Sequence, residues 1–151
     1  MLANDQTVCQ FSYIQLNGFS KTIKMILYWS ETLQKHLFAT SAMSNKIVSI
    51  RQNNKVSINL GKSQKISLLK TIEAEAVILS RDKYDSVYRE IFNKHPLVLK
   101  FFFKNIDNPD YLIFTIDIKA INNVSEEAQR IIQEMERRQK ENIDKNEKEC
   151  Q

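Results

Sequence analysis

The sequence has 151 residues, of which 42% are hydrophobic and 26% charged, and this length and composition predict a soluble globular protein with one hydrophobic core. The chain contains only two glycines, and this number excludes the glycine-rich phosphate loops of the P-loop and dinucleotide-binding types. The net charge of +4 comes from scattered lysines rather than a dense basic stripe, so nucleic acid is not an expected partner.

The chain is predicted to begin with a β-hairpin. Strand-forming residues fill positions 8–16 and again 21–29, and Asn17-Gly18 between them is the strongest hairpin signal in the sequence. Both faces of the second strand become apolar towards its end. That pattern indicates a strand in the middle of a sheet.

A short strand, a short helix and two further strands are predicted next, at residues 37–40, 44–52, 55–60 and 66–79. Asn53 and Asn54 end the helix, because asparagine favours turns. The last of these strands is long, and its centre also fits a helix, since its β-branched residues favour a strand only moderately.

A helix at residues 80–94, a strand at 111–121 and a helix from residue 125 onwards complete the chain. The first helix is the clearest, because its apolar residues recur on one face and Pro96 explains its end. The apolar segment 97–103 fits either a short helix or a strand. The last helix has an apolar stripe, after which charge predominates and predicts a frayed or protruding end. The stripe consists of Ala128, Ile131, Ile132 and Met135.

The expected order of elements is hairpin, strand, short helix, strand, long strand, helix, strand and helix. Strands joined by short turns form a mostly antiparallel sheet. Several such strands in a compact domain tend to close into a barrel, which removes the sheet edges. We therefore predict a mainly β fold with flanking helices.

The location expected for this chain is the cytoplasm. No run of residues is long and apolar enough to cross a membrane, and the N-terminus lacks the apolar segment of a signal peptide. Cys9 and Cys150 lie near opposite ends and lack metal-binding spacing. They are expected as reduced thiols, with a disulfide between them as the alternative. No metal site is predicted.

The most informative segment runs from residue 35 to residue 55, where a strand leads through a polar turn into a short helix. Thr40, Ser41, Ser44 and Lys46 cluster at that junction. Backbone N–H groups at a helix start, hydroxyls and one ammonium together make a site for a phosphate group. The alternative is structural: Ser44 then caps the helix, and Lys46 is a solvated lysine in its first turn.

From about Phe11 to Val124 the sequence resembles the FMN-binding split-barrel family, whose best-known member is pyridoxamine 5'-phosphate oxidase. The tightest match is residues 38–46 (FATSAMSNK), followed by a helix and residues 53–58 (NNKVSI). A second match is residues 24–27 (KMIL), which are similar to the family's strand whose backbone lines the flavin ring. The resemblance implies an antiparallel split β-barrel of the FMN-binding type.

The resemblance also implies a flavin-binding domain at residues 1–124, with a C-terminal helix and charged tail at residues 125–151. The cofactor would be FMN, its phosphate and ribityl chain bound by hydroxyl and basic side chains and its ring edge by the strand at residues 24–27. The residues expected to bind it are Lys24, Met25, Ile26, Leu27, Thr40, Ser41, Ser44, Asn45 and Lys46. Of these, Ser44, Lys46 and Lys24 are expected at the phosphate, and Thr40 and Ser41 at the phosphate or the ribityl chain.

The sequence departs from pyridoxamine 5'-phosphate oxidase at several positions. Asn45 stands where the oxidase usually has a second basic residue, and Lys24 replaces an arginine that can bind phosphate through two nitrogens. On the strand near Leu69 the oxidase typically offers a glutamine to the flavin, and this chain has none there. The oxidase's C-terminal arginine and histidine pattern for pyridoxine phosphate is also missing. The resemblance therefore favours a smaller relative, a flavin-dependent oxidoreductase of unidentified substrate, with no catalytic residue assigned.

Two other functions stay open on the sequence alone. One is a non-catalytic sensor on the same barrel that binds flavin or haem. Haem would need an axial ligand, and the two histidines are His36, expected to face solvent, and His95, expected at a helix end. The other is an apo interaction domain whose basic helical tail docks a partner.

A homodimer with the flavin at the subunit interface is also expected from the resemblance. The number of large apolar side chains supports it, because they exceed what one small core needs. These include Trp29, Phe38, Phe101, Phe102 and Phe103.

Overall fold

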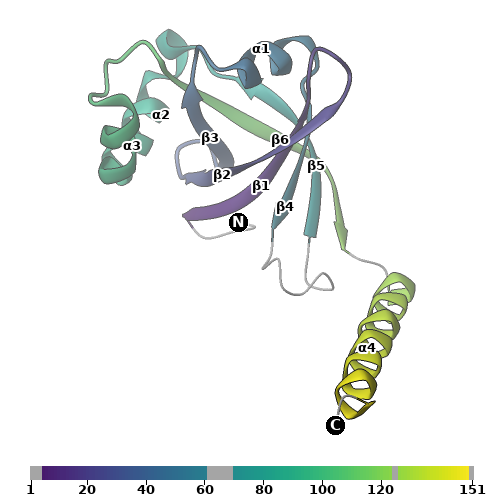
Figure 1. Cartoon of the computed structure of the whole chain (residues 1–151). Coiled ribbons are helices and arrows are strands. Elements are labelled where there is room, and N and C mark those ends of the chain that lie inside the picture. The colour runs from purple at the N-terminus through teal and green to yellow at the C-terminus, as the bar shows by residue number, and fades with distance from the viewer. Residues whose placement is uncertain (1–4, 61–69, 124–125, 150–151) are drawn as a thin grey trace.

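The computed structural model describes residues 5–60, 70–123 and 126–149. Its elements are, in chain order, β1 (Gln6–Ile14), β2 (Ser20–Ser30), β3 (Lys35–Ser41), α1 (Asn45–Gln52), β4 (Lys55–Leu60), β5 (Lys70–Ile78), α2 (Arg81–Lys94), α3 (Pro96–Phe103), β6 (Tyr111–Asn123) and α4 (Glu126–Glu149). The strands pair antiparallel and form a closed barrel in the order β1-β2-β3-β6-β5-β4. In Figure 1, α1 lies at one end of the barrel, α2 and α3 lie together at its side, and α4 projects from the opposite end.

The β1–β2 hairpin turns where Asn17-Gly18 predicted it. Gly18 has a φ of +87°, a left-handed conformation that glycine adopts without steric cost. The N–H of Phe19 donates to Oδ1 of Asn17 at 3.0 Å. β2 then pairs with β1 on one side and β3 on the other, so the prediction of a central strand is confirmed.

The interior of the barrel is a core of interleaved side chains. Phe11, Phe38 and Phe114 are all 0% exposed. Their ring centroids lie 5.0 Å apart for Phe11 and Phe38, 5.6 Å for Phe11 and Phe114, and 5.2 Å for Phe38 and Phe114. Ile47 and Ile50 of α1 pack against this core. Packing of these side chains in the interior therefore stabilises the barrel. Other residues of β2 and β3 lie on the outer faces of these strands.

A second core lies outside the barrel wall, where α2 and α3 pack against β2, β3 and β6. Tyr88 of α2 is central to it, since its hydroxyl donates to the carbonyl of Leu79 at 2.7 Å and accepts from the N–H of Ile113 at 3.0 Å. The hydroxyl of Tyr111 donates to the carbonyl of Tyr88 at 2.9 Å. Both buried hydroxyls are thus satisfied, and together they hold α2 against β6.

Glu90 of α2 ties this helix to the turn between β2 and β3. Its carboxylate accepts hydrogen bonds from Ser30 Oγ at 2.7 Å, from the N–H of Glu31 at 3.0 Å and from the N–H of Thr32 at 3.3 Å. The turn is thereby fixed from outside the sheet. The two strands that it joins, β2 and β3, are the ones that line the site described below.

The ambiguous segment at residues 97–103 is a helix, α3. Pro96 occupies its first turn, where the missing N–H leaves no bond unmade. Leu99 and Phe103 turn into the second core, whereas Phe101 and Phe102 are exposed. An apolar face of α3 therefore points away from the protein's own core.

His36 was expected to face solvent but is buried, because the β2–β3 pairing sets it opposite Trp29, whose ring it contacts. Its Nδ1 lies 3.3 Å from the carbonyl oxygen of Tyr28, and burial lowers its pKa. Cys9 is a buried free thiol. Residues 66–69 of the predicted long strand, and Cys150, lie outside the described residues.

Candidate functional site

A cavity of about 510 Å³ lies where β2, β3, α1 and α3 meet. This volume is within the range of small-molecule and cofactor sites. The strands supply Lys24, Met25 and Ile26 from β2, with Thr40 and Ser41 from β3. Lys46 enters from α1, and Asp110 from the loop before β6 also lines the wall, as do residues of α3. The cavity therefore joins segments that are far apart in sequence.

The polar part of the cavity centres on Lys46. Its Nζ donates to Oγ1 of Thr40 at 2.7 Å, and burial lowers the pKa of its ammonium. Neither Lys46 nor Lys24 forms an ion pair with any residue that the structure describes. A half-buried ammonium without a carboxylate is costly unless an anion joins it. This end of the cavity is therefore suited to an anionic group.

Ser41 is engaged differently from Thr40. Its hydroxyl donates to Oδ1 of Asp110 at 2.7 Å and accepts from the N–H of Met43 at 3.2 Å. The Ser41 proton is thus committed to Asp110 rather than free for a phosphate oxygen. The Thr40 hydroxyl accepts from Lys46 and keeps its own proton for donation.

The other part of the cavity is apolar. Ile26 and Tyr28 of β2 face Leu99, Phe102 and Phe103 of α3 across it. Phe102 is 64% exposed, and its neighbour Phe101 lies in an edge-to-face contact with it at 5.3 Å. Burial raises the pKa of Tyr28 to about 12, so its hydroxyl stays neutral. A flat apolar ring bound here would pack against aromatic and aliphatic side chains.

No protein-family model matches this sequence, and no curated protein matches it. Solved structures do match. HutZ, the haem storage protein from Vibrio cholerae, superposes with a TM-score of 0.60 at 12% identity, over 77% of this chain and 84% of that chain. General stress protein 26 from Bacillus anthracis gives 0.59 at 21% identity, over 77% and 82%. A provisional pyridoxamine 5'-phosphate oxidase from Listeria innocua gives 0.62 at 17% identity, over 78% and 87%.

The chain has the split-barrel fold of the pyridoxamine 5'-phosphate oxidase-like proteins. The fold class expected from the sequence, an antiparallel split β-barrel with flanking helices, is therefore confirmed. At these low identities the likeness concerns the fold, and the ligand has to be argued from the residues of the cavity.

This split barrel brings together six of the nine residues expected to bind a cofactor. Lys24, Met25, Ile26, Thr40, Ser41 and Lys46 all line the cavity. The other three are placed elsewhere: Leu27 is fully buried in the barrel interior, and Asn45 is exposed at the start of α1. The Oγ of Ser44 is enclosed and has no hydrogen-bond partner among the described residues, and Ser44 does not cap α1 through its side chain.

Two contributions to the cavity were not predicted from the sequence. Asp110 belongs to a turn, and its role depends on the β3–β6 pairing that sets Ser41 beside Tyr111. The α3 wall was visible only as an apolar run at residues 97–103, without a sign of which residues would stay exposed. The aromatic triplet Phe101, Phe102 and Phe103 is more than one helix face can bury, and this was the available signal.

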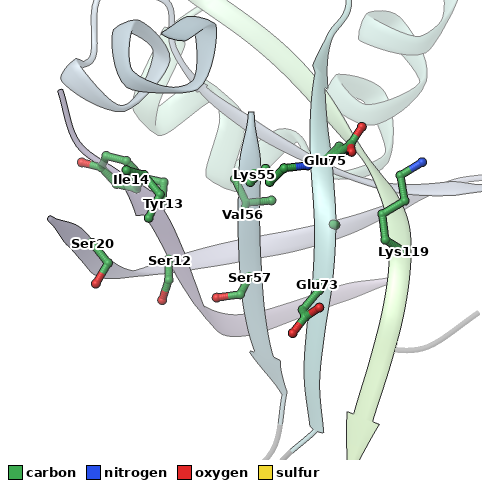
Figure 2. Close-up of a pocket in the computed structure, with 11 residues that line it drawn as sticks. Ser12, Tyr13, Ile14, Ser20, Lys55, Val56, Ser57, Glu73, Glu75 and Lys119 are labelled. Carbon is green, nitrogen blue, oxygen red and sulfur yellow. Dashed lines mark hydrogen bonds and ion pairs between the residues drawn. The ribbon is translucent and has the colours of Figure 1, made fainter. Parts of the chain in front are cut away.

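A second hollow, of about 320 Å³, lies on the outer face of the split barrel across β1, β4 and β5. Figure 2 shows Ser12, Ser57 and Glu73 in a row over these strands, with Lys55 beside Glu75. Its charges are already engaged. Lys55 pairs with Glu75 at 3.2 Å, and Glu73 accepts from Nδ2 of Asn122 at 3.3 Å. Among the described residues that line this hollow, no lysine lacks a carboxylate partner, in contrast to Lys46 in the cavity.

The two histidines are the candidates for an axial haem ligand. Neither His36 nor His95 lines the cavity at Lys46; His95 lies between α2 and α3 with its ring 4.8 Å from that of Tyr28. Among the described residues, no group of three or more His, Cys, Asp and Glu side chains could hold a metal ion. None of the helices in the described ranges is long and apolar enough to span a membrane.

Proposed function

We propose that this protein binds FMN in the cavity between β2, β3, α1 and α3 and that it is a flavin-dependent oxidoreductase. The observation that carries the proposal is the Lys46 ammonium, which is half-buried, bonded to Thr40 and without a carboxylate partner among the described residues. It stands at one part of a cavity whose other part is apolar and aromatic. A phosphate joined to a flat ring matches both parts.

The chain's own residues would then bind and orient the cofactor. The phosphate would be held by Lys46, Thr40 and Lys24. Thr40 accepts from Lys46, so its own hydroxyl proton is available for donation to a phosphate oxygen. The β2 strand at Met25 and Ile26 would lie along the ring, and Tyr28 and Phe102 would exclude water from it. Bound flavin supplies electron and hydride transfer. We assign no general acid or base among the cavity residues, so the protein's part in this proposal is positioning and shielding.

Titration with FMN and with riboflavin tests this proposal. FMN is expected to bind more tightly than riboflavin, because only FMN has the phosphate that Lys46 and Lys24 can pair with. Flavin fluorescence or calorimetry measures both affinities on the same sample. Equal affinities would contradict the proposed phosphate site. If neither compound bound, the proposal that the protein binds a flavin would be wrong.

Haem is the second candidate, since one protein with the same fold is a haem storage protein. An axial ligand would have to come from within the cavity, and neither histidine lines it. The visible spectrum of the purified protein distinguishes the candidates, because flavin, haem and an apo protein absorb differently. A haem spectrum would overturn the FMN proposal.

We further propose a homodimer, with residues 1–124 as the flavin-binding domain and residues 125–151 as a separate helix and charged tail. Two apolar surfaces of the single chain support this. The α3 face has Leu97, Phe101 and Phe102 exposed, and α4 has Ile131 and Met135 exposed while it projects from the barrel (Figure 1). A second copy could cover both and shield the open side of the cavity.

Truncation of α4 tests the role of its two halves. Deletion after Arg138 is expected to change neither the melting temperature nor flavin binding, because residues 139–148 are exposed and the segment is charged, with Ile143 as its one strongly apolar residue. Deletion of residues 128–151 is expected to lower the melting temperature and the dimer fraction, since it removes the apolar stripe. Calorimetry and light scattering with FMN bound measure these effects. A monomer mass for the full chain would exclude a shared site.

A further inference from the structure

We infer that Asp110 forms a subsite for hydroxyl groups, so that the cavity selects a flavin with a hydroxylated side chain at N10. This inference rests on the proposed function and names the part of the ligand that Asp110 recognises. It concerns a residue that the loop before β6 brings to the cavity wall beside Ser41.

The first step is the geometry of the Asp110 carboxylate. Its Oδ1 accepts from Ser41 Oγ at 2.7 Å and from the N–H of Met43 at 3.2 Å. Its backbone carbonyl accepts from the N–H of Ala42 at 2.8 Å. These three bonds hold the β3–α1 loop and fix the orientation of the carboxylate. Asp110 is therefore a preorganised group rather than a freely rotating surface side chain.

The second step is what the carboxylate leaves open. Oδ2 has no donor among the described residues, and no described lysine or arginine pairs with Asp110. Asp110 is half-buried and lines the same cavity as Lys24 and Lys46. An ionised carboxylate accepts hydrogen bonds and donates none. A ligand group that meets Oδ2 must therefore bring its own proton.

The third step is the chemistry of the ligand. A phosphate dianion beside Asp110 would be repelled, so Lys46 and Thr40 are the place for the anion and Asp110 is the place for a donor. Hydroxyl groups are donors without charge, and a hydrogen bond from a hydroxyl to a carboxylate is among the stronger ones. A chain of hydroxylated carbons that joins a ring to a phosphate, as in the ribityl phosphate of FMN, supplies both groups.

Riboflavin and lumiflavin test the inference, because they share the ring and differ in the hydroxylated chain. The wild-type protein is expected to bind riboflavin more tightly than lumiflavin. In Asp110→Ala this preference is expected to fall about tenfold or more, the range for hydrogen bonds to charged groups. Lumiflavin affinity itself is expected to stay near the wild-type value, because the ring does not need Asp110.

Asp107→Ala is the matched control. Asp107 is a carboxylate of the same loop, but its side chain is 78% exposed and does not line the cavity, so the preference for riboflavin is expected to remain. Asp110→Asn is the second variant in case Asp110→Ala does not fold. Its carbonyl can still accept from Ser41 and Met43, whereas its amide can form only a neutral hydrogen bond with a hydroxyl, so the preference should fall by less than in Asp110→Ala.

The results separate this inference from the proposed function. An unchanged riboflavin preference in the Asp110 variants, or an equal loss in Asp107→Ala, would overturn the hydroxyl subsite. So would equal binding of riboflavin and lumiflavin by the wild-type protein. The tighter binding of FMN over riboflavin depends on Lys46 and not on Asp110. It should persist in both Asp110 variants, and its absence in the wild-type protein would count against the phosphate site instead.

Discussion

Phe38→Ala is expected to lower the free energy of unfolding by about 3–5 kcal/mol, the typical cost of deleting a buried aromatic ring. Phe38 is fully buried in the barrel interior, with its ring 5.0 Å from Phe11 and 5.2 Å from Phe114. Strands around it hold these neighbours in place, so the space left by the ring can close only in part. Chemical denaturation of the flavin-free protein measures the loss.

Phe19→Ala is the matched control, because Phe19 is 74% exposed beside the β1–β2 turn. Its effect is expected to stay within about 0.5 kcal/mol, as for most surface substitutions. Similar losses in the two variants would contradict the packed interior. Folded Phe38→Ala should also retain the wild-type FMN affinity, since Phe38 does not line the proposed site. A large loss of FMN affinity in that folded variant would place the ligand inside the barrel.

Most of the barrel could be predicted because strand signals are local. Alternation with period two along β2 separates Leu27, which enters the barrel interior, from Tyr28, which enters the outer core. The turn at Gly18 is likewise local, since it depends on a positive φ that glycine adopts freely. The same local signals could not say that residues 97–103 form a helix, because a short apolar run fits either structure.

The site could be predicted in part, for a related reason. Thr40, Ser41 and Lys46 are close in sequence, and a strand followed by a short helix is enough to bring them together. Asp110 and Phe102 reach the cavity only through the pairing of β3 with β6 and the packing of α3. Leu27 shows the limit of closeness in sequence: its side chain is enclosed in the barrel core, although its neighbours Met25 and Ile26 line the cavity.

Lys46→Met is expected to weaken FMN binding about 10- to 150-fold, which corresponds to the roughly 1.5–3 kcal/mol of a charged hydrogen bond. Methionine keeps the apolar stem of the side chain and removes the ammonium. Riboflavin affinity is expected to change little, because riboflavin lacks the phosphate. The stability of the flavin-free protein should also change little, since the lost bond to Thr40 is offset by removal of a charge from a half-buried position.

Lys55→Met is the control that decides how this result is read. Lys55 is also a lysine near α1 in sequence, but its side chain is 73% exposed and pairs with Glu75 outside the cavity. Its loss should leave FMN binding unchanged, whereas a general effect of net charge on an anionic ligand would weaken binding in both variants. Unchanged FMN affinity in Lys46→Met would remove the phosphate from this end of the cavity. A loss confined to Lys46→Met, absent with riboflavin, would assign the FMN phosphate to the Lys46 ammonium, because the two flavins differ only in that group.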